Sequence, residues 1–382
     1  METKHNSKPT RPIRVLLVVR WPVGGIRTFM RYVYSRFPAE AYSFVLIAPD
    51  QPETRVLLED LAGLDIAYSP VSENPSSFEL GWETFRQLVT GTFDLVHSQG
   101  FTSGVCAALP ASLTRVPHLM TSHDVLGKRQ FQGRLGFIKR IGMEMAFLLI
   151  NTIQSVSHDA QANLLEFFPL LRDRCLVIPN GIEVVRFQQA EPRNLREELN
   201  VGDDCFLIGF LGRFMGQKGF AHLVDAVAQL SKNQTLHKNF LVVAFGEGGF
   251  IREEKAALQE RGLSDYFRFL PFTPNVAGVI KGLDLVVMPS LWEACGLLAM
   301  ETLVCGTPLV ASNCIGLREV VQDTPTIVVQ VGDSKALAAG IQFCMVPDLR
   351  QNFIDYAPVA AKRYDVKQTS GLLNTLIKDI TH

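Results

Sequence analysis

The sequence predicts an α/β protein made of two Rossmann-like domains, each built on a parallel sheet. Short apolar, β-branched runs alternate with helical patterns along the whole chain, as expected for repeated βαβ units. The length of 382 residues exceeds one ordinary core and suits two domains. We predict domains over residues 1–185 and 186–360, a charged, Pro-containing linker at 186–204, and a last helical segment within 361–382.

Composition excludes several classes of protein. Hydrophobic residues make up 47% and charged residues 20% of the chain, the proportions of a soluble globular enzyme. A net charge of -1 provides no general attraction to nucleic acid, so no nucleic-acid partner is expected. The seven cysteines include no Cys-x-x-Cys pair, which favours reduced thiols over disulfides or a zinc site. The polar N-terminus and the lack of a transmembrane-length apolar run predict a cytoplasmic protein.

In the first half, a buried strand at Ile13 to Val19 leads through a glycine pair, Gly24 and Gly25, into a helix at Ile26 to Phe37. The pair does not form the dinucleotide fingerprint, so a nicotinamide or flavin cofactor is not indicated. A plain tight turn is the alternative interpretation of these glycines. Further strands are predicted at Phe44 to Ala48, Asp94 to Ser98, His118 to Ser122, Thr152 to Val156 and Leu176 to Pro179.

His123 follows one of these strands directly. Ligands of open α/β sheets bind at the carboxyl ends of strands, which makes this histidine a candidate site residue. His97, at the end of another strand, is a second candidate. An ordinary hydrogen-bonded histidine is the alternative for either residue.

The second half opens with a strand at Cys205 to Arg213, a glycine-flanked loop, and a helix at Ala221 to Leu230. Arg213 and Lys218 lie in that loop. Glycines permit close approach, and fixed positive charges meet phosphate oxygens. A Gly-Arg-Lys loop can also be an ordinary connection.

The stretch from Pro289 to Ser312 contains two carboxylates, Glu293 and Glu301. The predicted helix from Leu297 to Cys305 is apolar almost all round and therefore buried, so Glu301 needs a cation or a ligand rich in hydroxyls as its partner. The amides near Cys295, Gly296 and Leu297 would lie at the helix N-terminus, which favours a phosphate. The alternative is an ordinary helix acid at 301 and a solvated loop acid at 293.

This stretch resembles the signature P-S-x-x-E-x-x-G-x-x-x-x-E of retaining glycosyltransferases of family four, also called group 1, in which two Rossmann-like domains face a cleft (the GT-B fold). Departures are Ala294-Cys295, Thr302 and Leu309. The resemblance implies that Glu301 holds the ribose hydroxyls and that Glu293 approaches the transferred sugar. It further implies roles for the remaining candidates, as a diphosphate clamp (Arg213 and Lys218), an active-site histidine (His123) and a first turn near the donor phosphate and the acceptor (Gly24 and Gly25). It also implies that the last helix crosses back to the first domain.

The function implied by this resemblance is transfer of a hexosyl group from a nucleoside diphosphate sugar to an acceptor hydroxyl, with retention of anomeric configuration, in glycan or glycolipid biosynthesis. The acceptor stays open between a glycan, a lipid-linked molecule and a small molecule. No Asp-x-Asp triplet occurs, so a metal-independent reaction without a cofactor is expected. A nucleotide-sugar epimerase of the same fold and a non-catalytic nucleotide-sugar-binding protein are the alternatives.

The segment from Lys128 to Arg140 mixes basic and apolar residues. Such a run is usually the solvated face of a surface helix. The alternative is a peripheral contact with the inner face of an anionic membrane or with a lipid-phosphate acceptor.

Overall fold

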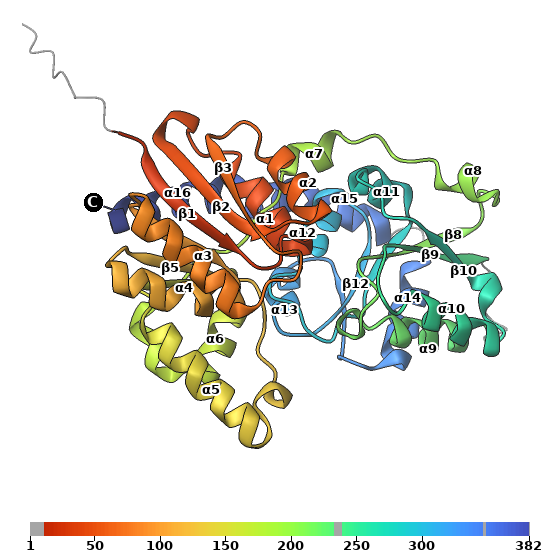
Figure 1. Cartoon of the computed structure of the whole chain (residues 1–382). Coiled ribbons are helices and arrows are strands. Elements are labelled where there is room, and N and C mark those ends of the chain that lie inside the picture. The colour runs from red at the N-terminus through yellow and green to blue at the C-terminus, as the bar shows by residue number, and fades with distance from the viewer. Residues whose placement is uncertain (1–10, 233–238, 347–348, 382) are drawn as a thin grey trace, which may run out of the picture. The chain divides into compact units, whose positions relative to one another are not determined.

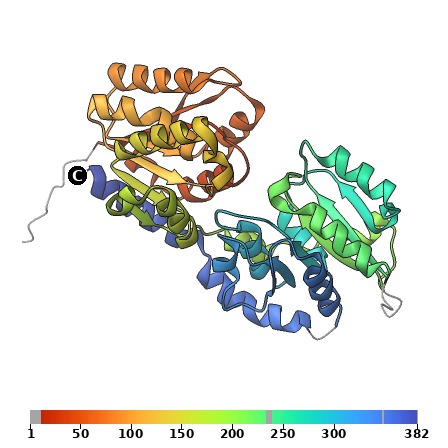
Figure 2. The same ribbon diagram turned by 90° about the horizontal axis from the view of Figure 1, so that it is seen from below.

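The computed structural model describes residues 11–232, 239–346 and 349–381, which fold as two compact units (Figure 1). Unit 1 comprises the chain up to Pro179 and from Lys367 onward, and unit 2 comprises Asn180–Val366. Each unit has one parallel sheet flanked by helices (Figures 1 and 2). The predicted α/β class with two Rossmann-like sheets is therefore confirmed. The polar N-terminal stretch considered above lies almost wholly outside the described residues.

The sheet of unit 1 has the strand order β3-β2-β1-β4-β5-β6-β7. Its strands are β1 (Ile13–Val19), β2 (Tyr42–Pro49), β3 (Ile66–Val71), β4 (Leu95–Gln99), β5 (His118–Ser122), β6 (Thr152–Ser155) and β7 (Cys175–Val177). Chain order reverses between β1 and β4, which are paired in parallel. At such a switch point the connections leave in opposite directions, and ligands bind beyond the strand ends.

The sheet of unit 2 has the order β10-β9-β8-β11-β12-β13, with the same reversal between β8 and β11. Its strands are β8 (Phe206–Leu211), β9 (Phe240–Phe245), β10 (Phe267–Leu270), β11 (Leu285–Met288), β12 (Leu309–Ser312) and β13 (Ile327–Val329).

Helices connect the strands in both units. Those before the unit boundary are α1 (Gly24–Tyr34), α2 (Pro52–Asp60), α3 (Ser77–Thr90), α4 (Phe101–Thr114), α5 (Gly133–Leu148) and α6 (His158–Phe167). Those of unit 2 are α7 (Val184–Gln189), α8 (Leu195–Leu199), α9 (Phe220–Leu230), α10 (Ile251–Glu260), α11 (Val276–Gly282), α12 (Leu297–Val304), α13 (Leu317–Val321), α14 (Ser334–Cys344) and α15 (Leu349–Arg363). Short 3-10 helices are η1 (Ala39–Ala41), η2 (Lys128–Phe131), η3 (Pro169–Arg174), η4 (Gly216–Lys218) and η5 (Ser264–Tyr266).

Buried central strands were predicted from the sequence, whereas the edge strand β3 was not. The strand predicted at His118 to Ser122 coincides with β5, whose residues are all buried. No strand was predicted at β3, where exposed and buried residues are mixed and Pro70 interrupts the run. Proline lacks a backbone N–H, and it is tolerated here because β3 lies at the edge of its sheet.

The linker predicted at residues 186–204 is wrong, because this segment packs onto unit 2 as α7 and α8. Phe187 is buried, and the ammonium of Lys281 donates hydrogen bonds to the carbonyls of Gln188 and Ala190 at 2.7 and 2.8 Å. The chain passes between the units at Pro179, six residues before the predicted limit at residue 185.

The helix α16 (Val366–Thr381) returns the end of the chain to unit 1. Thr369 donates to the carbonyl of Pro179 at 2.7 Å, and Ser370 donates to the carbonyl of Val33 at 3.0 Å. Tyr42 donates to the Asn374 side chain at 2.6 Å. These hydrogen bonds join α16 to the early part of unit 1, at Val33 and Tyr42, and to Pro179, where the first segment of unit 1 ends. No helix in the described part of the chain is both long enough and apolar enough to span a membrane.

We predict that acid destabilises the fold through buried histidines such as His118. Burial lowers the pKa of His118 from 6.5 to about 3. The unfolded chain therefore binds one more proton than the folded chain at pH values between these limits, and stability falls as the pH falls below about 6.5. His118→Asn should reduce the stability lost between about pH 8 and about pH 5 by about 2 kcal/mol, measured by urea unfolding. The exposed His158, changed to Asn, is the control, and an unaltered pH dependence in His118→Asn would contradict the prediction.

Candidate functional site

The candidate residues of unit 2 lie in loops that follow the two central strands. Arg213 and Lys218 follow β8, and Glu293 follows β11. Because β8 and β11 are neighbours at the point where strand order reverses, these loops leave the same edge of the sheet side by side.

The two loops are locked together by backbone contacts. Gly219 has a φ of +67°, and a Cβ placed there would lie 2.0 Å from the carbonyl oxygen of Pro289. The amide of Leu291 donates to the Gln217 carbonyl at 2.8 Å, and the Gln217 side chain donates to the Trp292 carbonyl at 2.9 Å. Only glycine satisfies both the backbone angle and the contact at position 219.

This docking brings Lys218 and Glu293 into an ion pair with a separation of 2.7 Å between Nζ and Oε1. Ser290 donates to the same oxygen at 2.7 Å. Glu293 is only 7% exposed, so the alternative of a solvated loop acid is wrong. Its Oε2 has no hydrogen-bond partner among the described residues. Ser290 was not predicted as a site residue, although its place three residues before Glu293 is a usable signal.

Arg213 differs from Lys218. Its side chain is exposed and makes no ion pair or hydrogen bond with any residue that the structure describes. The loop therefore carries one neutralised cation and one uncompensated cation.

The helix α12 begins as predicted and ends one residue earlier, with Gly296 before it at a φ of +53°. In the described chain, the backbone amides of Gly296, Leu297 and Leu298 donate to no carbonyl, as expected for a first helical turn. Burial raises the pKa of the neighbouring Cys295 thiol to about 12, so its sulfur is neutral beside these amides. The first turn can therefore accept an external anion.

Glu301 lies in the middle of α12 and is 9% exposed, so its predicted burial is observed. The helix is apolar around it, with Ala299, Met300 and Leu303 also buried. One carboxylate is thus present in the loop before the free amides, and a second lies one turn inside the helix.

In unit 1, the helix after β1 begins earlier than predicted. Gly24 and Gly25 belong to the first turn of α1 rather than to the preceding loop, and Gly24 has a φ of +56°. A Cβ at either glycine would meet nothing within 4 Å. One turn further along α1, Phe29 meets the His123 ring edge-on, with 4.8 Å between the ring centroids.

His123 lies at the end of a series of side-chain hydrogen bonds that runs through the interior of unit 1. Its Nε2 contacts Gln99 Oε1 at 2.7 Å, and Gln99 donates to the Tyr34 hydroxyl at 3.2 Å. The Tyr34 hydroxyl is 2.6 Å from His97 Nδ1. Beyond it, His97 Nε2 lies 2.8 Å from Thr121 Oγ1, which donates to Gln154 at 2.7 Å, and Gln154 donates to the backbone carbonyl of Ile178 at 3.1 Å.

The backbone carbonyl of Ile178 determines which group donates and which accepts in every hydrogen bond of this series. A carbonyl can only accept, so the Gln154 amide nitrogen faces it and the Gln154 oxygen must accept from Thr121. The Thr121 oxygen then accepts from His97 Nε2–H, which leaves His97 Nδ1 to accept from Tyr34. Because the Tyr34 hydroxyl donates to His97, its oxygen accepts from the Gln99 amide nitrogen. The Gln99 oxygen then faces His123 and accepts from His123 Nε2–H. His123 is thereby held as the Nε2–H tautomer, with the lone pair of Nδ1 free.

Burial supports this assignment because it disfavours the charged imidazolium. It lowers the pKa of His97 and of His123 to about 3. Burial also raises the pKa of Tyr34 well above its usual range, so its hydroxyl keeps the proton that it donates. His97 is therefore a positioning residue within this series of hydrogen bonds. Gln99 and Tyr34 were missed, since neither belongs to a local motif.

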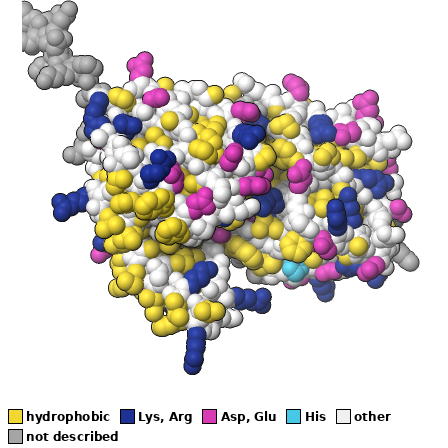
Figure 3. Space-filling model, viewed as in Figure 1, with side chains coloured by type: hydrophobic (Ala, Val, Ile, Leu, Met, Phe, Trp, Pro, Cys, Tyr) yellow, Lys and Arg dark blue, Asp and Glu magenta, His cyan; other side chains and the backbone are white. Residues whose placement is uncertain are grey.

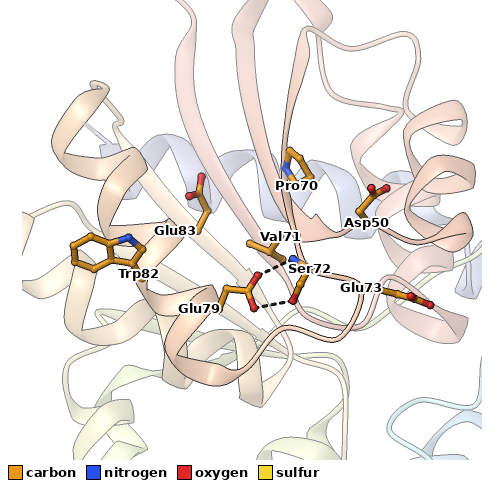
Figure 4. Close-up of a pocket in the computed structure, with 8 residues that line it drawn as sticks. All are labelled: Asp50, Pro70, Val71, Ser72, Glu73, Glu79, Trp82 and Glu83. Carbon is orange, nitrogen blue, oxygen red and sulfur yellow. Dashed lines mark hydrogen bonds between the residues drawn. The ribbon is translucent and has the colours of Figure 1, made fainter.

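A separate cavity of about 550 Å³ lies beyond the carboxyl ends of β2 and β3, next to α3 (Figure 4). Three of its acids, Asp50, Glu79 and Glu83, already have partners, and Asp50 pairs with Arg55 at 3.5 Å. Glu79 accepts hydrogen bonds from the amide and hydroxyl of Ser72, both at 2.7 Å. Burial alone would raise the pKa of Glu83, but hydrogen bonds from Arg86 and Ser69 lower it to about 2. None of the predicted site residues lines this cavity.

Comparison with known families identifies the chain. The family described as glycosyl transferases group 1 matches residues 192–359, and Glycosyltransferase Family 4 matches residues 23–186. The chain belongs to the family 4 glycosyltransferases of the GT-B fold. Both matched families are glycosyltransferases, which favours the transferase interpretation over the epimerase and the non-catalytic protein.

Relatives of this glycosyltransferase act on different molecules. A D-inositol 3-phosphate glycosyltransferase of Corynebacterium jeikeium is 29% identical over 310 residues, which are 76% of this chain and 73% of the relative. An alpha-maltose-1-phosphate synthase of Mycolicibacterium smegmatis is 30% identical and covers 61% of this chain and 62% of its own length.

Solved structures show the same fold as this glycosyltransferase. The Anabaena protein HepE, solved with UDP and glucose, superposes with a TM-score of 0.81 at 20% identity, over 96% of this chain and all of HepE. A sucrose-phosphate synthase from Thermosynechococcus elongatus gives a TM-score of 0.75 at 18% identity, over 97% of this chain and 99% of its own.

We predict that Tyr34→Phe releases the tautomer of His123. The change removes the hydroxyl that donates to His97 and accepts from Gln99. The Ile178 carbonyl then no longer fixes the orientation of the Gln99 amide that bonds His123. Nitrogen NMR of histidine side chains should show a single Nε2–H form of His123 in the wild type and a mixture of forms in Tyr34→Phe. Tyr42→Phe is the matched control, because the buried Tyr42 donates a hydrogen bond to Asn374 and takes no part in the series of hydrogen bonds that ends at His123. An Nδ1–H tautomer in the wild type would refute the assignment.

Proposed function

We propose that this glycosyltransferase moves a hexosyl group from a nucleoside diphosphate sugar to an acceptor hydroxyl, with retention of anomeric configuration. The observation that carries the proposal is the composition of the loops after β8 and β11. They combine the uncompensated Arg213, the Lys218–Glu293 pair and the free amides at the start of α12. These groups match a diphosphate with hydroxyl-bearing groups on either side.

The donor diphosphate would be held without a metal ion. An ammonium group has three donors, and the contact with Glu293 uses one of them, so Lys218 can bind a phosphate oxygen while the ion pair persists. Arg213 supplies the charge that Glu293 does not offset. The first-turn amides of α12 add a partial positive charge and fixed donors.

The two carboxylates would bind hydroxyl groups of the donor. Glu293 uses Oε1 for Lys218 and Ser290, which leaves Oε2 to accept from the transferred sugar. Glu301 would accept from the ribose hydroxyls. HepE was solved with UDP-glucose, so uridine diphosphate glucose is the first donor to test for this chain.

His123 would contribute from unit 1. Held as the Nε2–H tautomer, it presents an unprotonated Nδ1 that can accept from a sugar hydroxyl. Its depressed pKa keeps it neutral at physiological pH, so it would act as a hydrogen-bond acceptor rather than as a cation. Gly24 and Gly25 leave open space at the first turn of α1, which suits the donor phosphate or the acceptor.

We predict that Glu301→Gln weakens binding of UDP by about 1.5–3 kcal/mol, the range for hydrogen bonds to a charged group. The substitution keeps the shape of the side chain and removes its charge. Calorimetry with UDP measures the effect, and Glu260→Gln, an exposed acid of α10, is the control. Unchanged affinity would rule out the ribose role of Glu301.

We predict further that transfer from uridine diphosphate glucose survives excess chelator. Arg213→Ala should lower turnover about a hundredfold, as for the loss of one group that stabilises a developing anion. Lys232→Ala, just beyond the C-terminal end of α9, should leave turnover unchanged. Activity that disappears in chelator and returns with magnesium or manganese would overturn the metal-free mechanism.

A further inference from the structure

The helix α5 packs against unit 1 through a narrow inner face. Gly136 and Phe147 are buried, and Arg140 donates to the carbonyl of Phe167 at 2.8 Å. A Cβ on Gly136 would lie 2.4 Å from the backbone of Phe131, so this glycine allows α5 and η2 to touch. Residues 136, 140 and 147 repeat at helical spacing, which places them on one side of the helix.

The opposite side of α5 is apolar and exposed. Phe137, Ile138, Ile141, Met145 and Leu148 share one broad stripe at helical spacing, with exposures between 36% and 66%. An amphipathic surface helix normally turns its apolar stripe inward, whereas α5 has a second stripe that points away from the core. We call these five residues the α5 stripe.

The apolar surface extends beyond α5. Trp82 on α3 and Leu113 on α4 are 58% and 65% exposed. In Figure 3, hydrophobic side chains gather over the α3, α4 and α5 part of the visible face, and Lys and Arg side chains protrude from its lower edge. An exposed apolar patch of this extent indicates an interaction surface.

Positive charge surrounds the α5 stripe. Residues 128–149 contain five cations and one acid, whereas the whole chain has a net charge of -1. The five cations are Lys128, Arg129, Arg134, Lys139 and Arg140, and the acid is Glu144. Among the described residues, Arg129, Arg134 and Lys139 form no ion pair, so their charges are available to an external anion.

We propose that the α5 stripe and its cations dock this protein onto an anionic lipid bilayer. Apolar side chains would enter the boundary between headgroups and acyl chains, and the flanking cations would meet lipid phosphates. A second copy of the chain fits this surface less well, because two copies facing each other would oppose the unpaired Arg129, Arg134 and Lys139 of one copy to the same three cations of the other. This docking does not depend on the proposed transfer reaction.

The test is sedimentation of the full chain with vesicles of phosphatidylcholine, with or without phosphatidylglycerol. The wild type should bind the anionic vesicles, bind neutral vesicles much less, and dissociate in high salt. Phe137→Ser/Ile138→Ser should weaken binding to anionic vesicles about tenfold or more. Arg134→Gln/Lys139→Gln should weaken it by a similar factor.

Matched changes elsewhere separate docking from general surface effects. Phe343→Ser/Ile354→Ser replaces the same residue types at exposed sites of unit 2, and Lys232→Gln/Lys335→Gln removes two exposed cations there. Both controls should bind like the wild type. The proposal fails if the wild type does not bind anionic vesicles or if the control pairs lose as much binding as the α5 variants. It also fails if the α5 stripe instead supports lipid-free dimers or a protein complex that Phe137→Ser/Ile138→Ser abolishes.

Discussion

The candidate donor site depends on one close backbone contact, that of Gly219 with the carbonyl of Pro289. Any side chain at position 219 would force the loop after β8 away from the loop after β11. The ion pair between Lys218 and Glu293 exists only because these loops touch. Gly316 repeats the principle on the far side of Glu293, where an added Cβ would lie 2.1 Å from the Glu293 carbonyl oxygen. Glycines thus hold a buried carboxylate and its cation within contact distance of each other.

Unit 1 positions its candidate residue in another way. A line of neutral, buried side chains leads from a backbone carbonyl at Ile178 to the ring of His123. Each donor in the line leaves the next group a single remaining role, so one fixed acceptor determines a tautomer several residues away. The low dielectric that makes these groups costly to leave unpaired also keeps both histidines of the line uncharged. The orientation and the neutral state of His123 therefore both result from the burial of this line of hydrogen-bonded side chains.

The surface of unit 1 shows why a whole-chain charge is a poor guide to partners. A net charge of -1 conceals a segment with five cations and one acid, next to an apolar stripe that no part of the described core covers. In the sequence, the same residues are those of an ordinary surface helix. Their exposure distinguishes the two interpretations, because only a side chain that is left uncovered can meet a partner.

The amino-acid sequence was enough to predict the fold class, the buried central strands, the start of α12 and the burial of Glu301, because these follow from periodicity, glycine positions and apolar composition over short stretches. It did not reveal the edge strand β3, the packing of α7 and α8 onto unit 2, or the first turn of α1. The pairing of Lys218 with Glu293 and the orientation of His123 by Tyr34 and Gln99 became visible only in the folded structure. The physical reason is that these contacts join residues far apart in the chain, and a local pattern carries no information about which strand ends the sheet brings together.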